Sequence, residues 1–355
     1  MPGRLDRWLQ LVVEAGGSDL LLVSGAPPSV RIDGRLRPLA PEPLDGAAVE
    51  ESVVEALPEY ARNCYESGGV ADASYSIASL GRFRINLHRE RRQPAAAIRA
   101  LPTRVPRLAE LGLPASIELL SRLPHGLVLI GGPTGSGKST TLAAIVAEIN
   151  ARDPRHIVTI EDPIEYLHAN QSAIIEQVEI GIDAPDFPSA LRASLRQAPD
   201  VIVVGEMRDP ETMRIALAAA ETGHLVFSTV HTTDAASTVA RIADSFPTER
   251  QPTIRQELAM ALTAVMTQQL IPKIGGGLVP AAELLIVSYG ARQHIRRNAL
   301  QHFHQEMTIT RRLGSFTLED CLTQLVKGKL IEKHEAFTRA AHPDELDQLL
   351  RRIAD

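Results

Sequence analysis

A glycine-rich loop between two apolar stretches constrains the fold of this chain more than any other feature. Residues 127–130 are four consecutive apolar residues and predict a buried strand, while residues 142–149 form a helical pattern with one apolar side. A chance match of a glycine-rich turn is the alternative, but the strand before the loop and the helix after it favour phosphate binding. The residues that fit the phosphate-binding pattern G-x-x-x-x-G-K-[ST] are Gly132, Gly137, Lys138 and Ser139.

The residue types explain how such a loop would hold a nucleotide. Glycines allow backbone conformations that turn N–H groups inward, toward a phosphate chain at the start of the following helix. Lys138 would reach the β- and γ-phosphates, and Ser139 would hold Mg²⁺. The sequence therefore predicts ATP and Mg²⁺ as cofactors. The predicted nucleotide-binding residues of the loop are Gly132, Pro133, Thr134, Gly135, Ser136, Gly137, Lys138, Ser139 and Thr140.

Length, charge and cysteine content set broader limits. The chain of 355 residues is long enough for two domains, and its net charge of -6 argues weakly against nucleic acid as the main partner. Cys64 and Cys321 lie far apart, which argues against a disulfide framework and a structural zinc site and fits a reducing cytoplasm. No stretch approaches the roughly 18 apolar residues of a membrane span, so we expect any membrane association to go through a partner.

The first hundred residues predict a small α+β domain with an antiparallel sheet. Residues 81–89 alternate between an apolar and a polar face, as a half-buried strand does. Arg82, Arg84 and Arg99 lie on the predicted strands. They form either a solvated polar face or arginine fingers that reach phosphates across a domain or subunit boundary. We expect the domain to span residues 1–100.

After a proline-punctuated linker over 101–115, strands and helices alternate, which indicates a parallel sheet with covering helices. We expect an α/β ATPase core over 116–290 and a helical C-terminal region over 291–355, and residues 253–269 also have a mostly helical pattern. The predicted strands are 127–130, 157–160, 201–204, 225–229 and 282–287. The predicted helices are 138–150, 186–197, 210–221 and 235–243.

Carboxylates follow two of these strands, at the end where ligands collect in open α/β sheets. Glu206 ends the strand at 201–206, and three acids lie within 161–165. A P-loop ATPase needs an acid to activate the attacking water and an acid to hold Mg²⁺. Because Gly205 replaces the first acid of the usual pair, the missing acid would come from the 161–165 box. A solvated strand-end acid and an exposed acidic turn are the alternatives.

His224 and His231 flank the strand at 225–229. An extended strand of this length places the two rings near opposite ends, which argues against a shared metal ion. His231 follows the strand at its carboxyl end and could sense the γ-phosphate. A structural hydrogen-bonding role is equally compatible with the sequence.

Four boxes together resemble the type II/IV secretion ATPase superfamily and, more narrowly, the retraction (twitching motility) ATPases of type IV pili. The likeness runs in order from about residue 18 to residue 335. The boxes are the glycine-rich loop at 132–141, Ile-Glu-Asp-Pro-Ile-Glu-Tyr at 160–166, Gly-Glu-Met-Arg-Asp at 205–209, and Thr-Gly-His-Leu-Val-Phe-Ser-Thr-Val-His-Thr at 222–232.

The resemblance implies a PAS-like N-terminal domain, a RecA-like ATPase domain and a homo-hexameric ring. It implies that Glu206 is the catalytic glutamate and that Glu165 is an essential acid, which with Ser139 would hold Mg²⁺ beside ATP. The remaining residues that it assigns to the nucleotide site are the histidine-box residues His224 and His231 and the N-terminal arginines Arg82, Arg84 and Arg99.

The implied function is ATP-driven pilus retraction, in which the ring moves pilin from the pilus base into the inner membrane. The implied partners are an inner-membrane platform protein and the pilus machinery, and the implied location is the cytoplasm, peripheral to the inner membrane through those partners. The tetracysteine zinc motif of the assembly ATPases does not occur in this sequence, which favours retraction.

One segment departs from the retraction enzymes. They carry Ala-Ile-Arg-Asn-Leu-Ile-Arg-Glu after the core, where this chain has Gly-Ala-Arg-Gln-His-Ile-Arg-Arg at 290–297, so that Arg297 replaces an acid. An accessory or regulatory ATP-binding paralogue is therefore the alternative function. A RecA-like nucleic-acid translocase is a third interpretation, but the basic residues near 292–297 and 311–312 lack interleaved aromatic residues.

Overall fold

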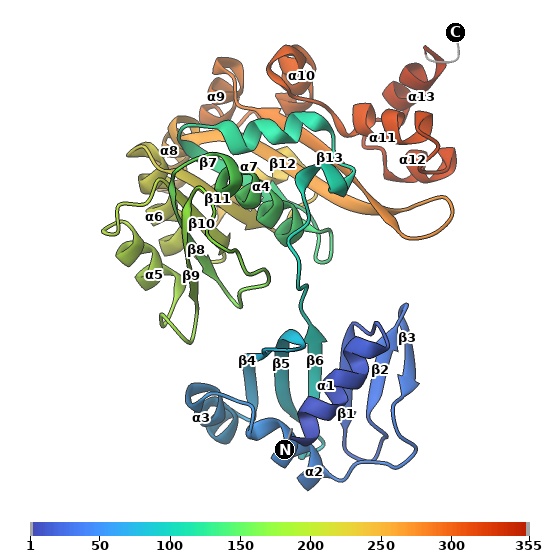
Figure 1. Ribbon diagram of the computed structural model, residues 1–355. Coiled ribbons are helices and arrows are strands. Elements are labelled where there is room, and N and C mark those ends of the chain that lie inside the picture. Colours follow the sequence, from blue (N-terminus) through green and yellow to red (C-terminus); the bar gives the residue numbers. More distant parts are fainter. Residues whose placement is uncertain (1–2, 353–355) are drawn as a thin grey trace. The chain divides into compact units, whose positions relative to one another are not determined.

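The computed structural model describes residues 3–352, which form two compact units (Figure 1). One unit contains the chain up to Arg104 together with Pro163–Leu167. The other contains Val105–Asp162 and the chain from His168 onward. None of the helices within 3–352 has the length and apolarity that a membrane crossing requires.

The first unit is built on a six-stranded antiparallel sheet in the order β3-β2-β1-β6-β5-β4. The predicted alternation is confirmed, because Phe83, Ile85 and Leu87 are buried on one face of β5, where they join the core of the unit. Its strands are β1 (Asp19–Val23), β2 (Ser29–Ile32), β3 (Arg35–Pro38), β4 (Val70–Ile77), β5 (Gly81–Glu90) and β6 (Gln93–Ala100). Its helices are α1 (Arg4–Glu14), α2 (Gly46–Val54) and α3 (Glu59–Gly68).

The second unit is built on a seven-stranded sheet in the order β13-β12-β7-β11-β10-β8-β9. Neighbouring strands are parallel except for the antiparallel pair β12–β13. The α/β class predicted from strand–helix alternation is confirmed, with an antiparallel sheet in the first unit and a mixed, mainly parallel sheet in the second. The strands are β7 (Gly126–Gly131), β8 (His156–Glu161), β9 (Ile174–Glu179), β10 (Val201–Glu206), β11 (Leu225–Val230), β12 (Leu262–Pro272) and β13 (Leu278–Ile286).

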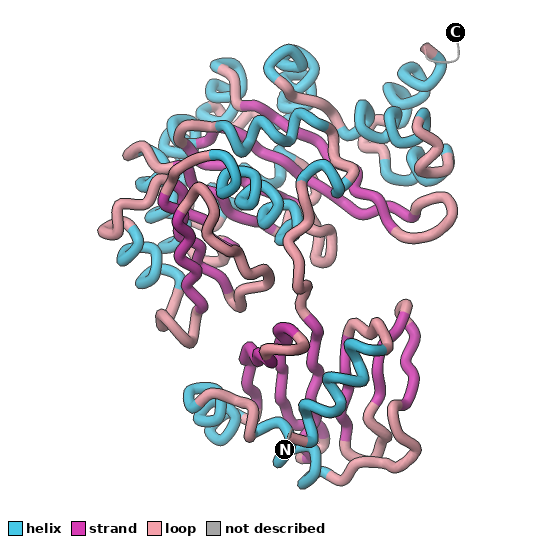
Figure 2. Tube along the Cα trace, viewed as in Figure 1, coloured by secondary structure: helices cyan, strands magenta, loops and turns pink. Residues whose placement is uncertain are grey.

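Helices cover both faces of this sheet, as the ribbon and the tube coloured by secondary structure show (Figures 1 and 2). Along β7, Leu127 and Leu129 join one buried cluster and Val128 and Ile130 join the other, so the strand is apolar on both sides. The first cluster includes residues of α5 (Phe187–Ser194), α6 (Pro210–Glu221), α7 (Ala235–Asp244), α8 (Gln251–Ala261), α9 (Tyr289–Arg296) and α10 (Phe303–Ile309). The second includes residues of the 3₁₀ turns η1 (Leu108–Leu111) and η2 (Ala115–Arg122) and of α4 (Lys138–Arg152).

A third cluster lies where the far ends of β12 and β13 meet the C-terminal helices. Ile271 and Val279 pack there with buried residues of three helices, including Leu322 and Leu346. The helices are α11 (Leu318–Lys327), α12 (Lys333–Arg339) and α13 (Pro343–Arg351). The mostly helical pattern predicted after residue 290 is therefore confirmed.

The helical pattern predicted over 253–269 is wrong in its second half. The helix α8 ends at Ala261, and β12 begins at Leu262 and runs between β7 and β13. A strand that is buried on both faces has no alternating polarity, so its apolar run is also compatible with a helix.

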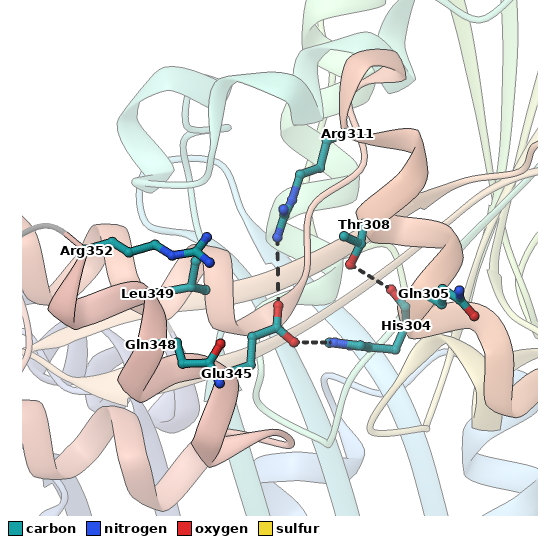
Figure 3. Close-up of a pocket in the computed structure, with 8 residues that line it drawn as sticks. All are labelled: His304, Gln305, Thr308, Arg311, Glu345, Gln348, Leu349 and Arg352. Carbon is teal, nitrogen blue, oxygen red and sulfur yellow. Dashed lines mark hydrogen bonds and ion pairs between the residues drawn. The ribbon is translucent and has the colours of Figure 1, made fainter.

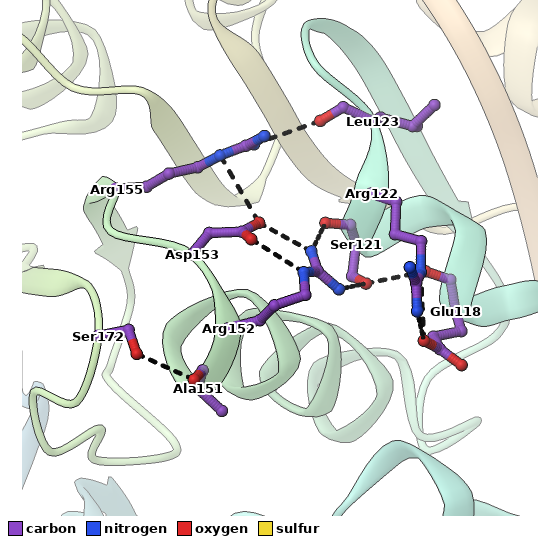
Figure 4. Close-up of polar contacts among 9 residues, drawn as sticks. All are labelled: Glu118, Ser121, Arg122, Leu123, Ala151, Arg152, Asp153, Arg155 and Ser172. Atoms are coloured by element: carbon purple, nitrogen blue, oxygen red, sulfur yellow. Dashed lines mark hydrogen bonds and ion pairs between the residues drawn. The ribbon is translucent and has the colours of Figure 1, made fainter.

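The far end of α4 is fixed by a cluster of arginines and acids (Figure 4). Arg152 donates to the backbone oxygen of Ser121 at 2.7 Å and to both carboxylate oxygens of Asp153 at 2.8 and 2.9 Å. The hydrogen bond from Arg152 lowers the pKa of Asp153 below its ordinary value. Arg155 adds a 3.2 Å bond to the backbone oxygen of Leu123. The helix that begins in the glycine-rich loop is thus tied to the segment before β7.

A buried carboxylate links the antiparallel edge of the sheet to α7. Glu283 of β13 accepts hydrogen bonds from the Ala235 amide at 2.7 Å and from the Thr267 hydroxyl at 3.1 Å. Burial raises its pKa from 4.5 to about 7, and the charges of Asp234 and Glu319 act in the same direction, while the two hydrogen bonds oppose the shift. The folded protein therefore holds a proton on Glu283 that the unfolded chain releases between about pH 4.5 and pH 7.

This linkage predicts the pH dependence of Glu283→Gln. The contribution of a raised carboxyl pKa to stability is full below pH 4.5 and is lost as the pH rises through about 7. Glutamine cannot ionise, so the free energy of unfolding of the variant minus that of the wild type should rise by about 2 kcal/mol from pH 5 to pH 8 in urea titrations. The same difference for Glu42→Gln, an exposed control, should stay flat. A flat difference for Glu283→Gln would contradict the assignment.

Candidate functional site

The glycine-rich loop joins β7 to α4, as the sequence predicts. A Cβ atom at Gly132 would lie 2.4 Å from the Ser136 hydroxyl and 2.5 Å from the Gln268 backbone oxygen, so no other residue fits without a shift of the loop. Gly137 caps α4 in the left-handed conformation with φ of 87°. The loop therefore presents the N-terminus of a 15-residue helix, which is a favourable place for an anion.

Lys138 is buried at the start of α4, and its ammonium group bonds to the loop itself. The Nζ atom donates to the backbone oxygens of Gly132 and Pro133, each at 2.9 Å, and lies 3.4 Å from Nδ1 of His231. A buried ammonium group is costly unless it is compensated by such acceptors. The lysine is thus held where loop carbonyls and a histidine meet.

His231 connects this lysine to the predicted catalytic acid. Its Nδ1 faces Lys138, and its Nε2 lies 3.4 Å from a carboxylate oxygen of Glu206. Because the ammonium group can donate but not accept, Nδ1 is the acceptor and the ring proton is on Nε2, facing Glu206. Partial burial, with the charges of Lys138 and Arg208, lowers the pKa of His231, which favours this neutral tautomer at pH 7.

Glu206 ends β10 at a register irregularity against β11, which sets its backbone apart from the regular ladder. Its side chain is mostly buried and forms an ion pair with Arg208. A Cβ atom at the preceding Gly205 would lie 3.2 Å from the Ile160 backbone oxygen of the neighbouring strand. A side chain at position 205 would therefore require that strand to shift by a few tenths of an ångström.

The acidic box follows β8. Glu161 accepts a hydrogen bond from the Thr159 hydroxyl at 2.7 Å and one from the Gln177 side chain at 3.2 Å. Glu165 lies in the segment Pro163–Leu167, which belongs to the first compact unit, and its side chain is half-buried. The role of Glu165 at the metal ion stays a prediction.

The three predicted arginines lie on neighbouring strands of the first unit. Arg84 and Arg99 are directly opposite each other in the β5–β6 ladder. Arg84 forms an ion pair with Asp72 at 3.6 Å, and Arg99 donates to Asp19 at 2.9 Å. Arg82 is half-buried on β5. Their role as arginine fingers stays a prediction.

His224 lies at the other end of β11 from His231, as expected. It precedes Leu225, which pairs with Gly126 at the start of β7, whereas Val230 pairs with Gly131 beside the loop. Five residues of strand put these two pairs roughly 17 Å apart. Within one chain, His224 is therefore remote from the glycine-rich loop, and its Nδ1 lies 2.9 Å from the Ala219 backbone oxygen.

A further residue, which sequence reasoning missed, braces the loop. Gln268 of β12 is buried, donates to the Ser136 backbone oxygen at 2.6 Å and accepts from the Thr141 hydroxyl at 2.8 Å. One side chain thus joins the loop to the first turn of α4. The helical pattern predicted over 253–269 includes position 268, so the sequence does not predict a strand residue beside the loop there.

The comparisons with known proteins agree with this geometry. The family model described as type II/IV secretion system protein matches residues 94–339. The chain belongs to the type II/IV secretion ATPase family. The predicted family and the predicted enzyme class, a P-loop ATPase, are thereby confirmed.

Individual members of the family match over nearly the whole chain. The type IV pilus retraction ATPase PilT of Pseudomonas aeruginosa is 41% identical over 95% of this chain and 98% of its own length. The type IV pilus ATPase PilU of the same organism is 36% identical over 98% of this chain and 91% of its own length. A crystal structure of the pilus retraction motor PilT with bound ADP is 42% identical and has a TM-score of 0.88, covering 98% of this chain and 100% of that chain.

Gln268 provides a direct test of how the loop is held in this ATPase. We expect Gln268→Leu to weaken the binding of a fluorescent ADP analogue about tenfold, because the variant removes two buried hydrogen bonds that fix the loop. The neighbouring Gln269, which is less buried, offers the matched control Gln269→Leu. Equal affinities of the two variants would show that Gln268 does not position the loop.

Proposed function

We propose that this chain is an ATP-hydrolysing motor of the pilus-retraction type. The observation that carries the proposal is the meeting of Lys138, His231 and Glu206 at the carboxyl ends of β7, β10 and β11. Nucleotide hydrolysis uses a cation for the phosphates and a group that positions or activates the attacking water, which are the roles we assign to Lys138 and Glu206. His231 contacts both side chains.

The proposed roles follow from the contacts. Lys138 would leave the carbonyls of Gly132 and Pro133 for the β- and γ-phosphates when nucleotide binds, and Ser139 would hold Mg²⁺. Glu206 accepts the proton of the attacking water. The imidazole of His231 contacts both Lys138 and Glu206. Loss of the γ-phosphate would therefore alter the position of both side chains through their shared contact with this ring. Glu165 keeps its predicted role and would be the second acid at the metal ion.

Retraction is the first candidate because the retraction ATPase PilT is 41% identical to this chain over nearly all of both proteins. By the same reasoning we propose a homo-hexamer that works in the cytoplasm, at the inner membrane, against a platform protein of the pilus machinery. Nucleic acid is not among the proposed partners.

The accessory ATPase is kept as a second candidate because of α9 and the residue after it. Arg292 bonds to the backbone oxygens of Ala259 and Met260 at the end of α8, so its side chain is occupied within the fold. Tyr289 is 77% exposed and Arg297 is also exposed. This outward surface carries a positive charge where the retraction enzymes have an acid, and PilU, at 36% identity, is an example of a related pilus ATPase.

Steady-state ATP hydrolysis tests the proposal. We expect Mg²⁺-dependent turnover by a hexamer, measured by phosphate release and light scattering in the same buffer. Turnover should fall at least a hundredfold in Glu206→Gln, because the variant loses the general base, while ADP affinity stays near that of the wild type. Glu249→Gln, at an exposed turn, is the matched control.

The two candidates give different results in this assay. The motor is supported if the wild-type hexamer and Glu249→Gln both hydrolyse ATP and only Glu206→Gln loses turnover. A wild-type protein that binds ATP but turns over no faster than Glu206→Gln contradicts the motor and supports the accessory subunit.

A further inference from the structure

Three helices of the C-terminal region bring one histidine and two glutamates together. His304 comes from α10, Glu319 from the first turn of α11 and Glu345 from the first turn of α13. One possible ligand atom from each residue lies within 4.8 Å of the other two. The Nε2 atom of His304 is 2.6 Å from a carboxylate oxygen of Glu345, and both side chains line an open pocket (Figure 3).

Glu319 is the observation that points to a ligand. Its side chain is completely buried, and one of its oxygens accepts a hydrogen bond from the His342 amide at 2.8 Å. The other oxygen is buried and has no hydrogen-bond partner within residues 3–352. A buried carboxylate oxygen without a partner is costly, and a bound cation is one of the few groups that removes the cost.

The nearby arginine is already engaged. Arg311 binds Asp320 through two bonds of 3.0 and 2.9 Å, and it lies 3.8 Å from the oxygen of Glu345 that does not face His304. Arg311 thus lies at the side of the cluster and is held there by another acid. The two carboxylates and the imidazole carry a net negative charge when the imidazole is neutral, and Arg311 pairs only with the oxygen of Glu345 that faces away from His304.

We propose that His304, Glu319 and Glu345 bind a divalent transition-metal ion of the Zn²⁺ type. An imidazole nitrogen with carboxylate oxygens is a donor set that suits Zn²⁺, whereas Mg²⁺ and Ca²⁺ favour oxygen ligands alone. Three protein ligands leave a coordination position for water on the side of the pocket. The ion ties α10 to α11 and α13 and so stabilises the C-terminal helices.

The sequence prediction of no structural zinc site rests on cysteine spacing and does not bear on this set. The three ligands lie on separate helices, so no local motif marks them. The cluster is also separate from the glycine-rich loop, since its three residues lie on α10, α11 and α13, whereas the loop follows β7, whose end pairs with the end of β11.

Zinc titration of the full-length, chelator-treated protein without nucleotide tests the proposal. With ZnCl₂ alone, isothermal calorimetry should give one strong site per chain, and the melting temperature should rise by a few degrees once Zn²⁺ exceeds the Kd about a hundredfold. His304→Ala and Glu345→Gln should each weaken binding at least tenfold. His334→Ala removes an exposed histidine beside Glu335 and is the matched control, which should bind zinc as the wild type does.

Substitution with Co²⁺ gives a second readout, because a tetrahedral or five-coordinate site produces visible absorption that the two variants should lose. If His304→Ala fails to fold by circular dichroism, Glu345→Gln, which keeps the side-chain size, decides the question. Absence of a strong site in the wild type, or unchanged zinc affinity in the folded variants, overturns the proposal.

Discussion

The arrangement of the ATPase unit depends on a buried lysine and on the groups that compensate its charge. Lys138 is held by two backbone oxygens of its own loop and by His231. These contacts require a loop that curls back over the start of α4, which only glycine permits at position 132. They also require that β11 end beside β7, so that His231 reaches the same point. The order of the strands in the sheet is therefore what brings His231 to Lys138.

The sheet meets this requirement because its central strands are apolar on both faces. Val128 and Ile130 face α4, while Leu127 and Leu129 face the helices on the other side. With both faces covered, the polar groups of the unit collect at the strand ends, and Glu206, His231 and the loop come from three neighbouring strands. β12, on the other side of β7, completes the arrangement by bracing the loop through Gln268.

The features that could be predicted from the sequence are those that a run of consecutive residues encodes. The strand–loop–helix around Lys138 and the alternation on β5 are carried by consecutive residues, and both were predicted. The strand β12 was not predicted, because a strand buried between two others shows no alternation of polar and apolar residues. Without that strand, the contact of Gln268 with the loop could not be predicted either. The contact of His231 with Glu206 was missed for a different reason: it joins two strand ends 25 residues apart in the chain, and only the parallel register brings them together.

The burial of the carboxylates Glu283 and Glu319 could not be predicted either, because the spacing of residues along the chain gives no indication of it.

A crystal structure of the protein with an ATP analogue and Mg²⁺ tests the central claim most directly. The account predicts that Lys138 Nζ leaves the oxygens of Gly132 and Pro133 and lies within hydrogen-bonding distance of the β- and γ-phosphates, with His231 and Glu206 on the γ-phosphate side. A nucleotide bound away from the loop, or a lysine that keeps both carbonyl contacts in the complex, would contradict it.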